Sequence, residues 1–372
     1  MIFHSTYSKP ILLVGNGARI SGANELILEF CRKTNIPVLT SMNGVDLAQD
    51  ENHIGFIGTH GNRIANMILN ECDLVISVGV RLGLRQVGRY VENFAPKADL
   101  IRADIDEFEL SRNIKENERK YHTDARDFLN LLLKENIPDY IDWNKKCKKA
   151  KEVLDSYDME EGNLAVEKIS SMLPVNPVVA VDIGQNQCWC AQSLHLKGHE
   201  GRILIGGGYG AMGCGLPFAI GASISMGNSL TYCICGDGGF QMNIQELEVV
   251  KRDKLPIKIF ILNNRVLGKI SETQHINHSD RYAQTTKHSG YTVPDFTKIS
   301  EAYGIKAAKL MSYTEIDQYV SWITDDEPCL FDIFLPEDSF LVPKIKWETC
   351  KTEPELPNNV IDNVVKILQG KI

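Results

Sequence analysis

The sequence lacks the features that mark secreted, membrane-spanning and nucleic-acid-binding proteins. Its ten cysteines form no CxxC pair and no zinc-like spacing, and a disulfide framework is not expected in a chain of 372 residues. No segment approaches the roughly 20 apolar residues of a membrane helix, and no basic region precedes the short apolar run near the N-terminus. The net charge of −8 excludes the basic surface that attracts nucleic acid or an acidic membrane. We therefore expect a soluble, cytoplasmic protein that binds neither.

What the sequence does contain is a globular composition with alternating strand and helix patterns. It is 43% hydrophobic and 24% charged, so a large core can form without disulfides. The alternation in both halves predicts an α/β protein with two doubly wound parallel-sheet domains. The expected strands lie at 10–15, 36–41, 73–79, 99–106, 177–184, 201–206, 230–239, 256–264 and 327–336, and the last of these is expected to close the second sheet.

The composition changes between the two halves of the chain. A lysine-rich stretch within residues 143–162 is interpreted as a solvated linker helix rather than a basic binding patch. This divides the chain into a central Rossmann-like domain over 1–142, the linker helix over 143–162 and a second α/β domain over 163–345. A polar tail over 346–372 comes last and ends in one short amphipathic helix.

Polar residues follow two consecutive strands of the second domain. Asp237 lies in a Gly-Asp-Gly turn at the end of one strand, and Asn264 ends the next. Ligands of open α/β sheets bind beyond the carboxyl ends of the strands, and consecutive parallel strands are commonly neighbours. Carboxylate and amide oxygens suit Mg²⁺, while the open N–H groups of Gly238 and Gly239 suit an anion. The sequence therefore predicts a Mg²⁺–diphosphate site.

This spacing resembles the cofactor motif of enzymes that depend on thiamine diphosphate (ThDP). A stretch of 24 residues separates Gly-Asp-Gly from Asn263-Asn264, and "GDGGFQMNIQELEVV" and "ILNNRVLG" match the motif beyond these residues. The segments "DIGQNQCWCAQ" (182–192) and "GGYGAMGCGLPFAIGA" (207–222) are similar to acetolactate synthase large subunits. The resemblance covers nearly the whole chain, with the first domain in the place of the family's central domain. It implies ThDP and Mg²⁺ as cofactors.

The resemblance implies roles for the matching residues at the metal and the diphosphate. Asp237, the side chain of Asn264 and the carbonyl of Val266 would bind Mg²⁺. Gln185 and Asn186 would approach the diphosphate, and Asn186 stands where the family usually has His. The full set of implied cofactor-binding residues is Gln185, Asn186, Gly210, Met212, Gly236, Asp237, Gly238, Gly239 and Asn264.

Two residues of the glycine-rich loop are implied to take part in catalysis. Met212 would lie beneath the bent cofactor, and the carbonyl of Gly210 would accept a hydrogen bond from the aminopyrimidine. The exocyclic amine would then be held against the thiazolium C2 and take its proton. The resulting ylid carries the chemistry, while the protein supplies conformation and electrostatics.

The implied activity is decarboxylation of a 2-oxo acid, with pyruvate as the first donor to test, and transfer of the two-carbon unit to a carbonyl acceptor. Thr273 stands near the position of the Trp that shapes the acceptor pocket of acetolactate synthases. In this stretch the sequence resembles the acetolactate-synthase-like proteins of surface-sugar biosynthesis more closely. The family's pyrimidine-binding domain is expected to be missing from this chain. A homo-oligomer or a separate pyrimidine-domain chain would then have to complete the site, and the chain alone would be inactive.

Alternatives remain open at this level. The chain could be a non-catalytic ThDP-binding or assembly module, a truncated homologue. "GYGAMG" (208–213) is a GxGxxG, so an NAD-dependent dehydrogenase is a weaker alternative. FAD binds the central domain of acetolactate synthases, and "GTHGNRIAN" (58–66) fits that family, whereas "RLGLR" (81–85) replaces its Phe-Asp-Asp-Arg run. His275 and His278 lie in a polar loop that is either a substrate lid or solvated, and with no third ligand they do not predict a metal site.

Overall fold

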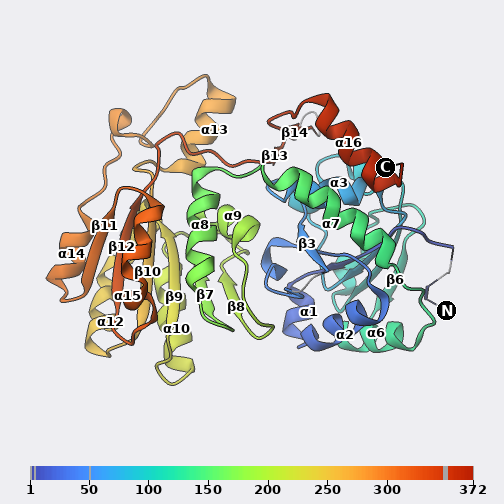
Figure 1. Cartoon of the computed structure of the whole chain (residues 1–372), viewed down its shortest axis with the longest axis horizontal. Helices are drawn as coiled ribbons and strands as arrows, with labels where there is room; N and C mark the ends of the chain where they lie inside the picture. Colours follow the sequence, from blue (N-terminus) through green and yellow to red (C-terminus); the bar gives the residue numbers. More distant parts are fainter. Residues whose placement is uncertain (1, 4–5, 50–51, 347–350, 372) are drawn as a thin grey trace. The chain divides into compact units, whose positions relative to one another are not determined.

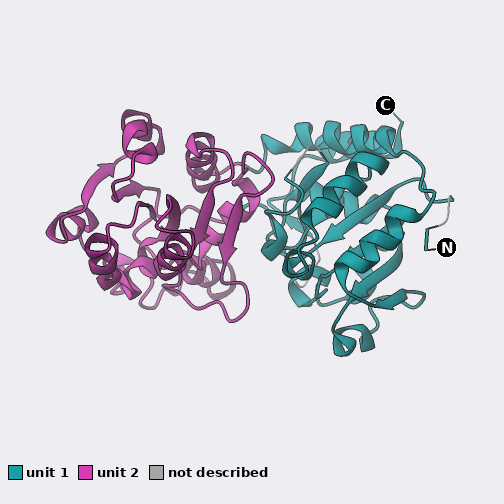
Figure 2. Ribbon diagram, turned by 90° about the horizontal axis from the view of Figure 1, so that it is seen from below, with its two compact units in different colours: residues 1–158, 342–372 teal, residues 159–341 magenta. Residues whose placement is uncertain are grey.

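The computed structural model describes residues 2–3, 6–49, 52–346 and 351–371. The chain divides into two compact units, which Figure 2 colours separately. Unit 1 comprises residues 1–158 and 342–372, and unit 2 comprises residues 159–341. Within the described ranges, none of the helices is both long and apolar enough to cross a membrane.

Unit 1 is built on a six-stranded parallel sheet in the order β3-β2-β1-β4-β5-β6. Its central strands are continuous apolar runs because helices cover both faces of such a sheet. The strand order reverses between β1 and β4, which is the order of dinucleotide-binding folds. The strands are β1 (Pro10–Val14), β2 (Val38–Thr40), β3 (His53–Phe56), β4 (Leu74–Val78), β5 (Asp99–Asp104) and β6 (Arg119–His122).

The helices of unit 1 include one from the C-terminal end of the chain. α16 packs against α7, as Figure 1 shows, and buries Val360, Val364 and Leu368 in the core of unit 1. A two-stranded antiparallel sheet, β13 (Lys344–Ile345) with β14 (Thr352–Glu353), precedes it. The helices are α1 (Asn16–Ile20), α2 (Asn24–Thr34), α3 (Arg63–Glu71), α4 (Leu84–Val87), α5 (Glu107–Ser111), α6 (Ala125–Lys134), α7 (Ile141–Asp155) and α16 (Asn358–Gln369), with 3₁₀ turns η1 (Met42–Gly44) and η2 (Val91–Asn93).

Unit 2 is built on a second six-stranded parallel sheet, in the order β11-β12-β10-β9-β7-β8. Its order reverses between β7 and β9, so a binding crevice is expected beyond the carboxyl ends of these strands. The strands are β7 (Val178–Val181), β8 (Arg202–Ile205), β9 (Thr231–Gly236), β10 (Ile257–Asn263), β11 (Lys306–Leu310) and β12 (Cys329–Phe334).

The helices of unit 2 connect successive strands and flank the sheet (Figure 1). α10 packs on β7, β9 and β10, and α14 packs on β11 and β12. The helices are α8 (Glu161–Met172), α9 (Gln185–Ser193), α10 (Gly215–Ser225), α11 (Asp237–Met242), α12 (Leu247–Arg252), α13 (Gly268–His278), α14 (Phe296–Ala302) and α15 (Val320–Thr324), with 3₁₀ turns η3 (Ile244–Glu246), η4 (Lys287–Ser289) and η5 (Tyr313–Tyr319).

The predicted fold class is confirmed, since both units are doubly wound parallel sheets. One detail of the prediction was wrong: β12 does not close the second sheet, because β11 pairs with its outer side. The sequence analysis also missed β3 and β6, which, like β11, are edge strands. An edge strand has a neighbour on one side only, and β6 and β11 are partly exposed. They therefore lack the long apolar run by which central strands are recognised.

Candidate functional site

The candidate site lies at the carboxyl edge of the unit 2 sheet. β9 and β10 are parallel neighbours, which confirms the adjacency expected from the sequence. Asp237 follows β9 as the first residue of α11, and Asn264 follows β10 directly. Both side chains are buried, with Asp237 3% and Asn264 4% exposed. Two strand ends therefore bring a carboxylate and an amide to one edge, out of contact with bulk water.

Asp237 is a buried carboxylate whose contacts are polar but uncharged. The Tyr291 hydroxyl donates to Asp237 Oδ2 at 3.2 Å, and Gln241 Nε2 donates to the Tyr291 oxygen at 3.3 Å. Burial raises the pKa of Asp237 to about 7, although hydrogen bonds from the Gly238 backbone and from Tyr291 oppose the rise. The sequence analysis missed Tyr291, which lies 54 residues further along the chain. A cation at Asp237 would favour its ionised form.

The two neighbouring asparagines have different contacts. Asn263 Nδ2 donates to Asp332 Oδ1 at 2.8 Å and so ties β10 to β12. Asn264 Nδ2 donates to Gln185 Oε1 at 2.9 Å. Arg265 has a φ of 58°, in the left-handed region, and the buried Val266 follows it. The chain thus turns sharply after Asn264, and the role of the Val266 carbonyl as a metal ligand stays a prediction.

Gln185 and Asn186, at the start of α9, use their amide groups within the protein. Gln185 Nε2 donates to the Ser339 carbonyl at 2.7 Å and lies 3.4 Å from Glu272 Oε2. Asn186 Nδ2 donates to the Asp182 carbonyl at 2.8 Å and lies 3.4 Å from the carbonyl of Ile234, so it links β7 to β9. The structure therefore gives both residues packing and orienting contacts, and their contact with a diphosphate stays a prediction.

Asp182 is a second residue that the sequence analysis missed. It is 1% exposed, and its Oδ1 accepts hydrogen bonds from Ile183 N at 2.6 Å and from Gly213 N at 2.9 Å. A Cβ on Gly239 would lie 2.7 Å from Asp182 Oδ2, and one on Gly215 would lie 2.9 Å from Asp182 Cβ. Asp182 therefore holds the glycine-rich loop against the start of α11, and both glycines are needed for the close approach.

The position of Asp182 bears on the dinucleotide alternative. In a dinucleotide fingerprint, the N–H groups at the end of GxGxxG and the following helix N-terminus receive a pyrophosphate. Here the Asp182 carboxylate accepts the N–H of Gly213, the last glycine of that motif, just before α10 begins. The protein's own anion lies where the pyrophosphate of NAD would bind.

Met212 lies beside the Gly-Asp-Gly turn. Its Cε would be 3.5 Å from a Cβ on Gly238, and Leu267 Cδ2 would be 2.6 Å from the same Cβ. Met212 is 36% exposed, and Gly210 has a φ of +69° in a part of the loop with open space around it. The structure thus brings Met212, Gly238 and Asp237 to one side of the sheet edge, with Gly210 on the exposed part of the same loop.

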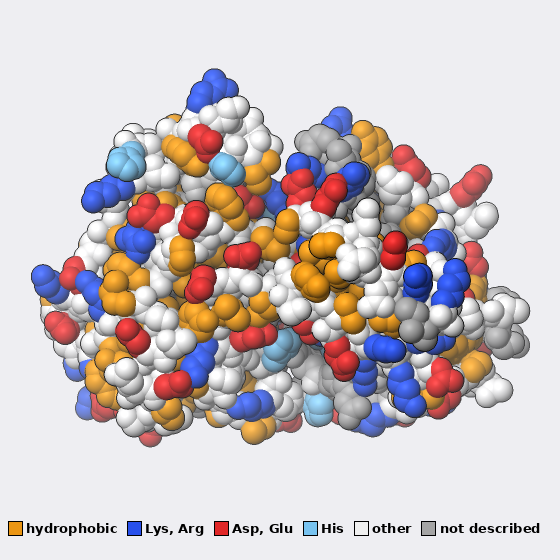
Figure 3. Space-filling view, turned by 45° about the horizontal axis from the view of Figure 1, so that its top comes forward, with side chains coloured by type: hydrophobic (Ala, Val, Ile, Leu, Met, Phe, Trp, Pro, Cys, Tyr) orange, Lys and Arg blue, Asp and Glu red, His pale blue; other side chains and the backbone are white. Residues whose placement is uncertain are grey.

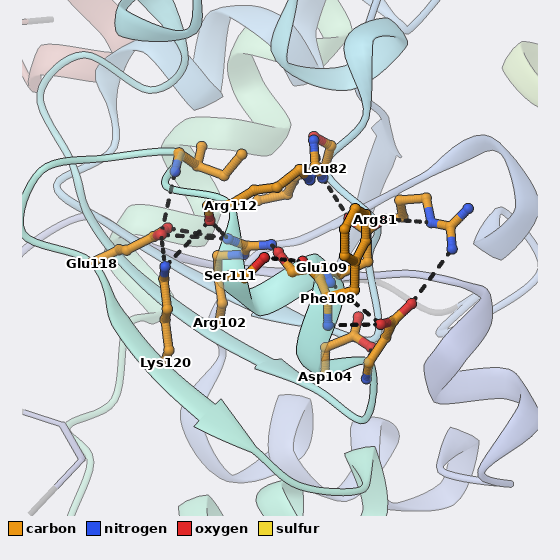
Figure 4. Close-up of polar contacts among 12 residues, drawn as sticks. Arg81, Leu82, Arg102, Asp104, Phe108, Glu109, Ser111, Arg112, Glu118 and Lys120 are labelled. Carbon is orange, nitrogen blue, oxygen red and sulfur yellow. Dashed lines mark hydrogen bonds and ion pairs between the residues drawn. The ribbon is translucent and has the colours of Figure 1, made fainter.

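The corresponding edge of unit 1 carries charges that are paired with one another. Arg81, 74% exposed, lies 3.0 Å from Glu109 and 3.6 Å from Asp106, as drawn in Figure 4. Arg102 is buried and pairs with Glu118, to which Lys120 also binds (Figure 4). At the switch point, Gly17 N donates to the Gly79 carbonyl at 2.9 Å, so the two loops pack backbone against backbone. These contacts stabilise the unit, and FAD binding by the central domain stays a prediction.

The prediction of a polar loop for His275 and His278 was wrong, because both lie near the end of α13, where they are exposed. His275 Nδ1 lies 2.6 Å from Asp280 Oδ1, and its ring stacks on Phe340. Among the residues that the structure describes, no group of three or more His, Cys, Asp or Glu side chains could hold a metal ion. The candidate cation site of Asp237 and Asn264 is of a different kind, because it combines one carboxylate with amide and carbonyl oxygens.

Comparisons with known proteins agree with this geometry. Residues 5–132 match the family model "Thiamine pyrophosphate enzyme, central domain", and residues 182–333 match "Thiamine pyrophosphate enzyme, C-terminal TPP binding domain". The isozyme 2 large subunit of acetolactate synthase from Escherichia coli is 32% identical over 88% of this chain and 60% of its own length. A probable large subunit from Methanocaldococcus jannaschii is 32% identical over 96% of this chain and 64% of its own. The chain thus spans less than two thirds of these relatives, and it belongs to the thiamine pyrophosphate enzymes, with similarity to acetolactate synthase large subunits.

Proposed function

We propose that the carboxyl edge of unit 2 binds Mg²⁺ and the diphosphate of ThDP, as part of an acetolactate-synthase-like enzyme. The enzyme would decarboxylate a 2-oxo acid, with pyruvate as the first donor to test, and transfer the two-carbon unit to a carbonyl acceptor. The observation that carries the proposal is the position of Asp237 and Asn264, buried at the ends of the adjacent strands β9 and β10. Carboxylate and amide oxygens are ligands that Mg²⁺ accepts together with phosphate oxygens.

The residues present fit the cofactor. Gly238 and Gly239 lie in the first turn of α11, and a Cβ on either would lie within 2.7 Å of a neighbouring side chain, so only glycine fits this close packing. Asp237 and Asn264 would hold the cation, Tyr291 would keep the Asp237 carboxylate in place, and Met212 would support the bent cofactor. Bound ThDP would supply a nucleophilic ylid carbon and a cationic thiazolium ring that takes up the electrons of the decarboxylation.

An additional polypeptide is expected to cover the site from outside. The loop and helices around Gly210 expose large apolar side chains, and Figure 3 shows hydrophobic side chains among the charged ones on the face it presents. Exposed apolar patches of this kind mark interaction surfaces. We propose that a pyrimidine-binding domain, from a copy of a longer chain or a separate chain, packs here. The apolar side chains are Tyr209, Met212, Phe218 and Met242.

The acceptor is proposed to differ from that of acetolactate synthases. Thr273 lies on the second turn of α13, half-buried, with its hydroxyl bonded to the Lys269 carbonyl at 3.0 Å. Because threonine is much smaller than the tryptophan of the family, it leaves room for a larger carbonyl compound.

The proposed function is tested first by the binding of Mg²⁺ and ThDP and then by the turnover of pyruvate. Thermal unfolding of the chain is measured with Mg²⁺ and ThDP for the parent, for Asp237→Ala and for the surface control Asp326→Ala. Stabilisation is expected for the parent and the control but not for Asp237→Ala. Release of CO₂ from pyruvate is then measured with a pyrimidine-domain partner added. Binding without turnover would favour the non-catalytic module, and equal binding by Asp237→Ala would refute the site.

A further inference from the structure

The end of the glycine-rich loop is held on both sides of Gly213. Gly213 N donates to the Asp182 carboxylate, at 2.9 Å from Oδ1 and 3.1 Å from Oδ2. The Gly213 carbonyl accepts a hydrogen bond from Asn243 Nδ2 at 2.7 Å. Gly213 has a φ of +83°, and a Cβ on it would lie 2.8 Å from Met242 Cβ. Only glycine therefore fits between these neighbours without displacing them.

These two hydrogen bonds fix the backbone next to Met212. The N–H of Gly213 belongs to the peptide group that also contains the Met212 Cα and carbonyl, and a peptide group is planar. The contact with Asp182 therefore fixes the plane from which the Met212 side chain leaves the backbone. The contact with Asn243 fixes the next peptide plane, between Gly213 and Cys214. The backbone at Met212 thus cannot rotate without breaking one of the two bonds.

Asp182 is a firm support because it is itself held in place directly after β7. Its backbone N–H donates to the Ile234 carbonyl in β9 at 2.9 Å, and its carbonyl accepts a hydrogen bond from Asn186 Nδ2 at 2.8 Å. Ile183 N donates to Oδ1 at 2.6 Å. Asp182 is 1% exposed, so bulk water does not compete for its carboxylate.

The part of the loop that precedes Gly213 is exposed. Residues 208–212 face solvent, whereas Gly213 is buried. Chain neighbours aside, no residue that the structure describes comes within 4 Å of a Cβ on Gly208 or Gly210. The loop therefore has an open arm and a fixed end. Met212 lies where the two meet, with its Cε 3.5 Å from a Cβ position on Gly238.

We propose that Asp182 and Asn243 are positioning residues, which hold the Met212 side chain in place for the bent cofactor. The proposal deepens the proposed function and rests on it. Neither residue needs to touch ThDP for this role, because both act through the peptide groups of Gly213. Without either contact, Met212 would move with the open arm, and binding of ThDP would have to order the loop at a cost in affinity.

A double-mutant cycle separates positioning from general support of the fold. If Asp182 acts through Met212, its replacement matters only while the Met212 side chain is present. The effects of Asp182→Asn and Met212→Ala on ThDP binding then do not add. If Asp182 only supports the fold of unit 2, the two changes weaken ThDP binding independently, and their effects add.

The experiment measures the concentration of ThDP that half-stabilises the full chain against heat at fixed Mg²⁺. Asp182→Asn keeps the shape but replaces one acceptor oxygen, and Asn243→Ala removes the donor to Gly213. Asp326→Asn, at an exposed position, is the matched control. We expect the ThDP midpoint to rise about tenfold for Asp182→Asn and for Asn243→Ala, within the range of coupling between residues in contact, and not at all for the control. In the Met212→Ala background, neither change should raise the midpoint further.

A second measurement follows Met212 directly. The methionine methyl groups of the full chain are labelled for NMR, and the Met212 resonance is assigned with Met212→Leu. We expect this resonance to shift in Asp182→Asn and in Asn243→Ala. The resonance of Met311, which is exposed directly after β11, should stay the same in both variants.

Each outcome decides a different point. Additive losses of ThDP affinity, or an unmoved Met212 resonance, would overturn the positioning role and leave the proposed function intact. A ThDP midpoint equal to that of the parent would overturn the role of the residue replaced. If Asp182→Asn does not fold, Asn243→Ala forms the same cycle with Met212→Ala and decides in the same way. No stabilisation of the parent by ThDP with Mg²⁺ would refute the proposed function, and the positioning role with it.

Discussion

The two units share an architecture but differ in the residues at the carboxyl ends of their strands. Each has six parallel strands with helices on both faces. In unit 1, the loops after β1 and β4 pack glycine against glycine, and the nearby charges pair with one another. In unit 2, the corresponding edge carries buried carboxylates and amides. The comparison shows that one fold can carry different side chains at the ends of its strands, so the fold alone does not determine function.

The electrostatics of the two edges sharpen this contrast. Burial raises the pKa of Asp182, Asp237 and Asp332 in unit 2, whereas Arg81 and Arg102 in unit 1 lie beside acidic partners. Burial is the main cause of these raised pKa values, because it disfavours the charged form of each carboxyl group. A cation bound beside any of them would favour its ionised form.

The largest expected effect on stability comes from disrupting the contact between the loops that follow β1 and β4 in unit 1. Gly79 has a φ of +62°, and a Cβ there would lie 2.4 Å from the backbone nitrogen of Ala18. Gly79→Ala is expected to cost about 2–4 kcal/mol of unfolding free energy, from left-handed strain and overpacking. Calorimetry should show a lower melting temperature for unit 1, while the Mg²⁺ and ThDP midpoints of unit 2 stay the same. Gly83→Ala, whose Cβ would make only ordinary contacts at 3.5 Å, is the control.

A pH dependence is expected for unit 2. The pKa of Asp237 is raised to about 7 from 3.8. Between these values the folded state keeps a proton that the unfolded state loses, so this group's contribution to stability falls as pH rises. Mg²⁺ must displace that proton, so its affinity should rise about tenfold per pH unit up to pH 7 and then level off. Mg²⁺ titrations from pH 5.5 to 8 measure this, and a flat profile would contradict the assignment of Asp237.

A smaller effect is expected from the hydroxyl that Tyr291 presents to Asp237. Tyr291→Phe keeps the ring and removes the donor, so Mg²⁺ affinity should fall about tenfold, in the range seen for groups behind metal ligands. The same measurement on Tyr313→Phe, in η5, gives the control. An unchanged Mg²⁺ midpoint for Tyr291→Phe would mean that the hydrogen bond to Asp237 plays no part in binding.

The smallest effect is expected from the exposed charge of unit 1. Arg81→Ala removes ion pairs with Asp106 and Glu109 but leaves Glu109 bonded to Arg112. Such exposed pairs contribute less than about 1 kcal/mol to stability. Chemical denaturation should register this small loss, and ThDP binding should not change. A large loss of binding would show that the two edges are not independent in function.

How well the sequence predicts a contact depends on how many residues separate the two partners along the chain. The placement of Asp237 and Asn264 at the ends of adjacent strands could be predicted, because a strand, a turn and the next strand belong to one local unit. The contacts of Asp182 and Tyr291 could not, since their partners lie 31 and 54 residues away and depend on how loops return to the sheet. The contact of Glu272 with Gln185 could not be predicted either, because nothing in the helical pattern tells which side of α13 meets Gln185.

The return of α16 to unit 1 has a consequence for how the protein is made. Most of unit 1 leaves the ribosome before unit 2, yet α16 (residues 358–369), which packs on α7, comes after it. All of unit 2 is synthesised in between. During translation, unit 2 can fold while α7 still exposes an apolar face, and chaperones have their longest opportunity to bind there. A stop codon between unit 2 and α16 would therefore cause aggregation before any loss of cofactor binding.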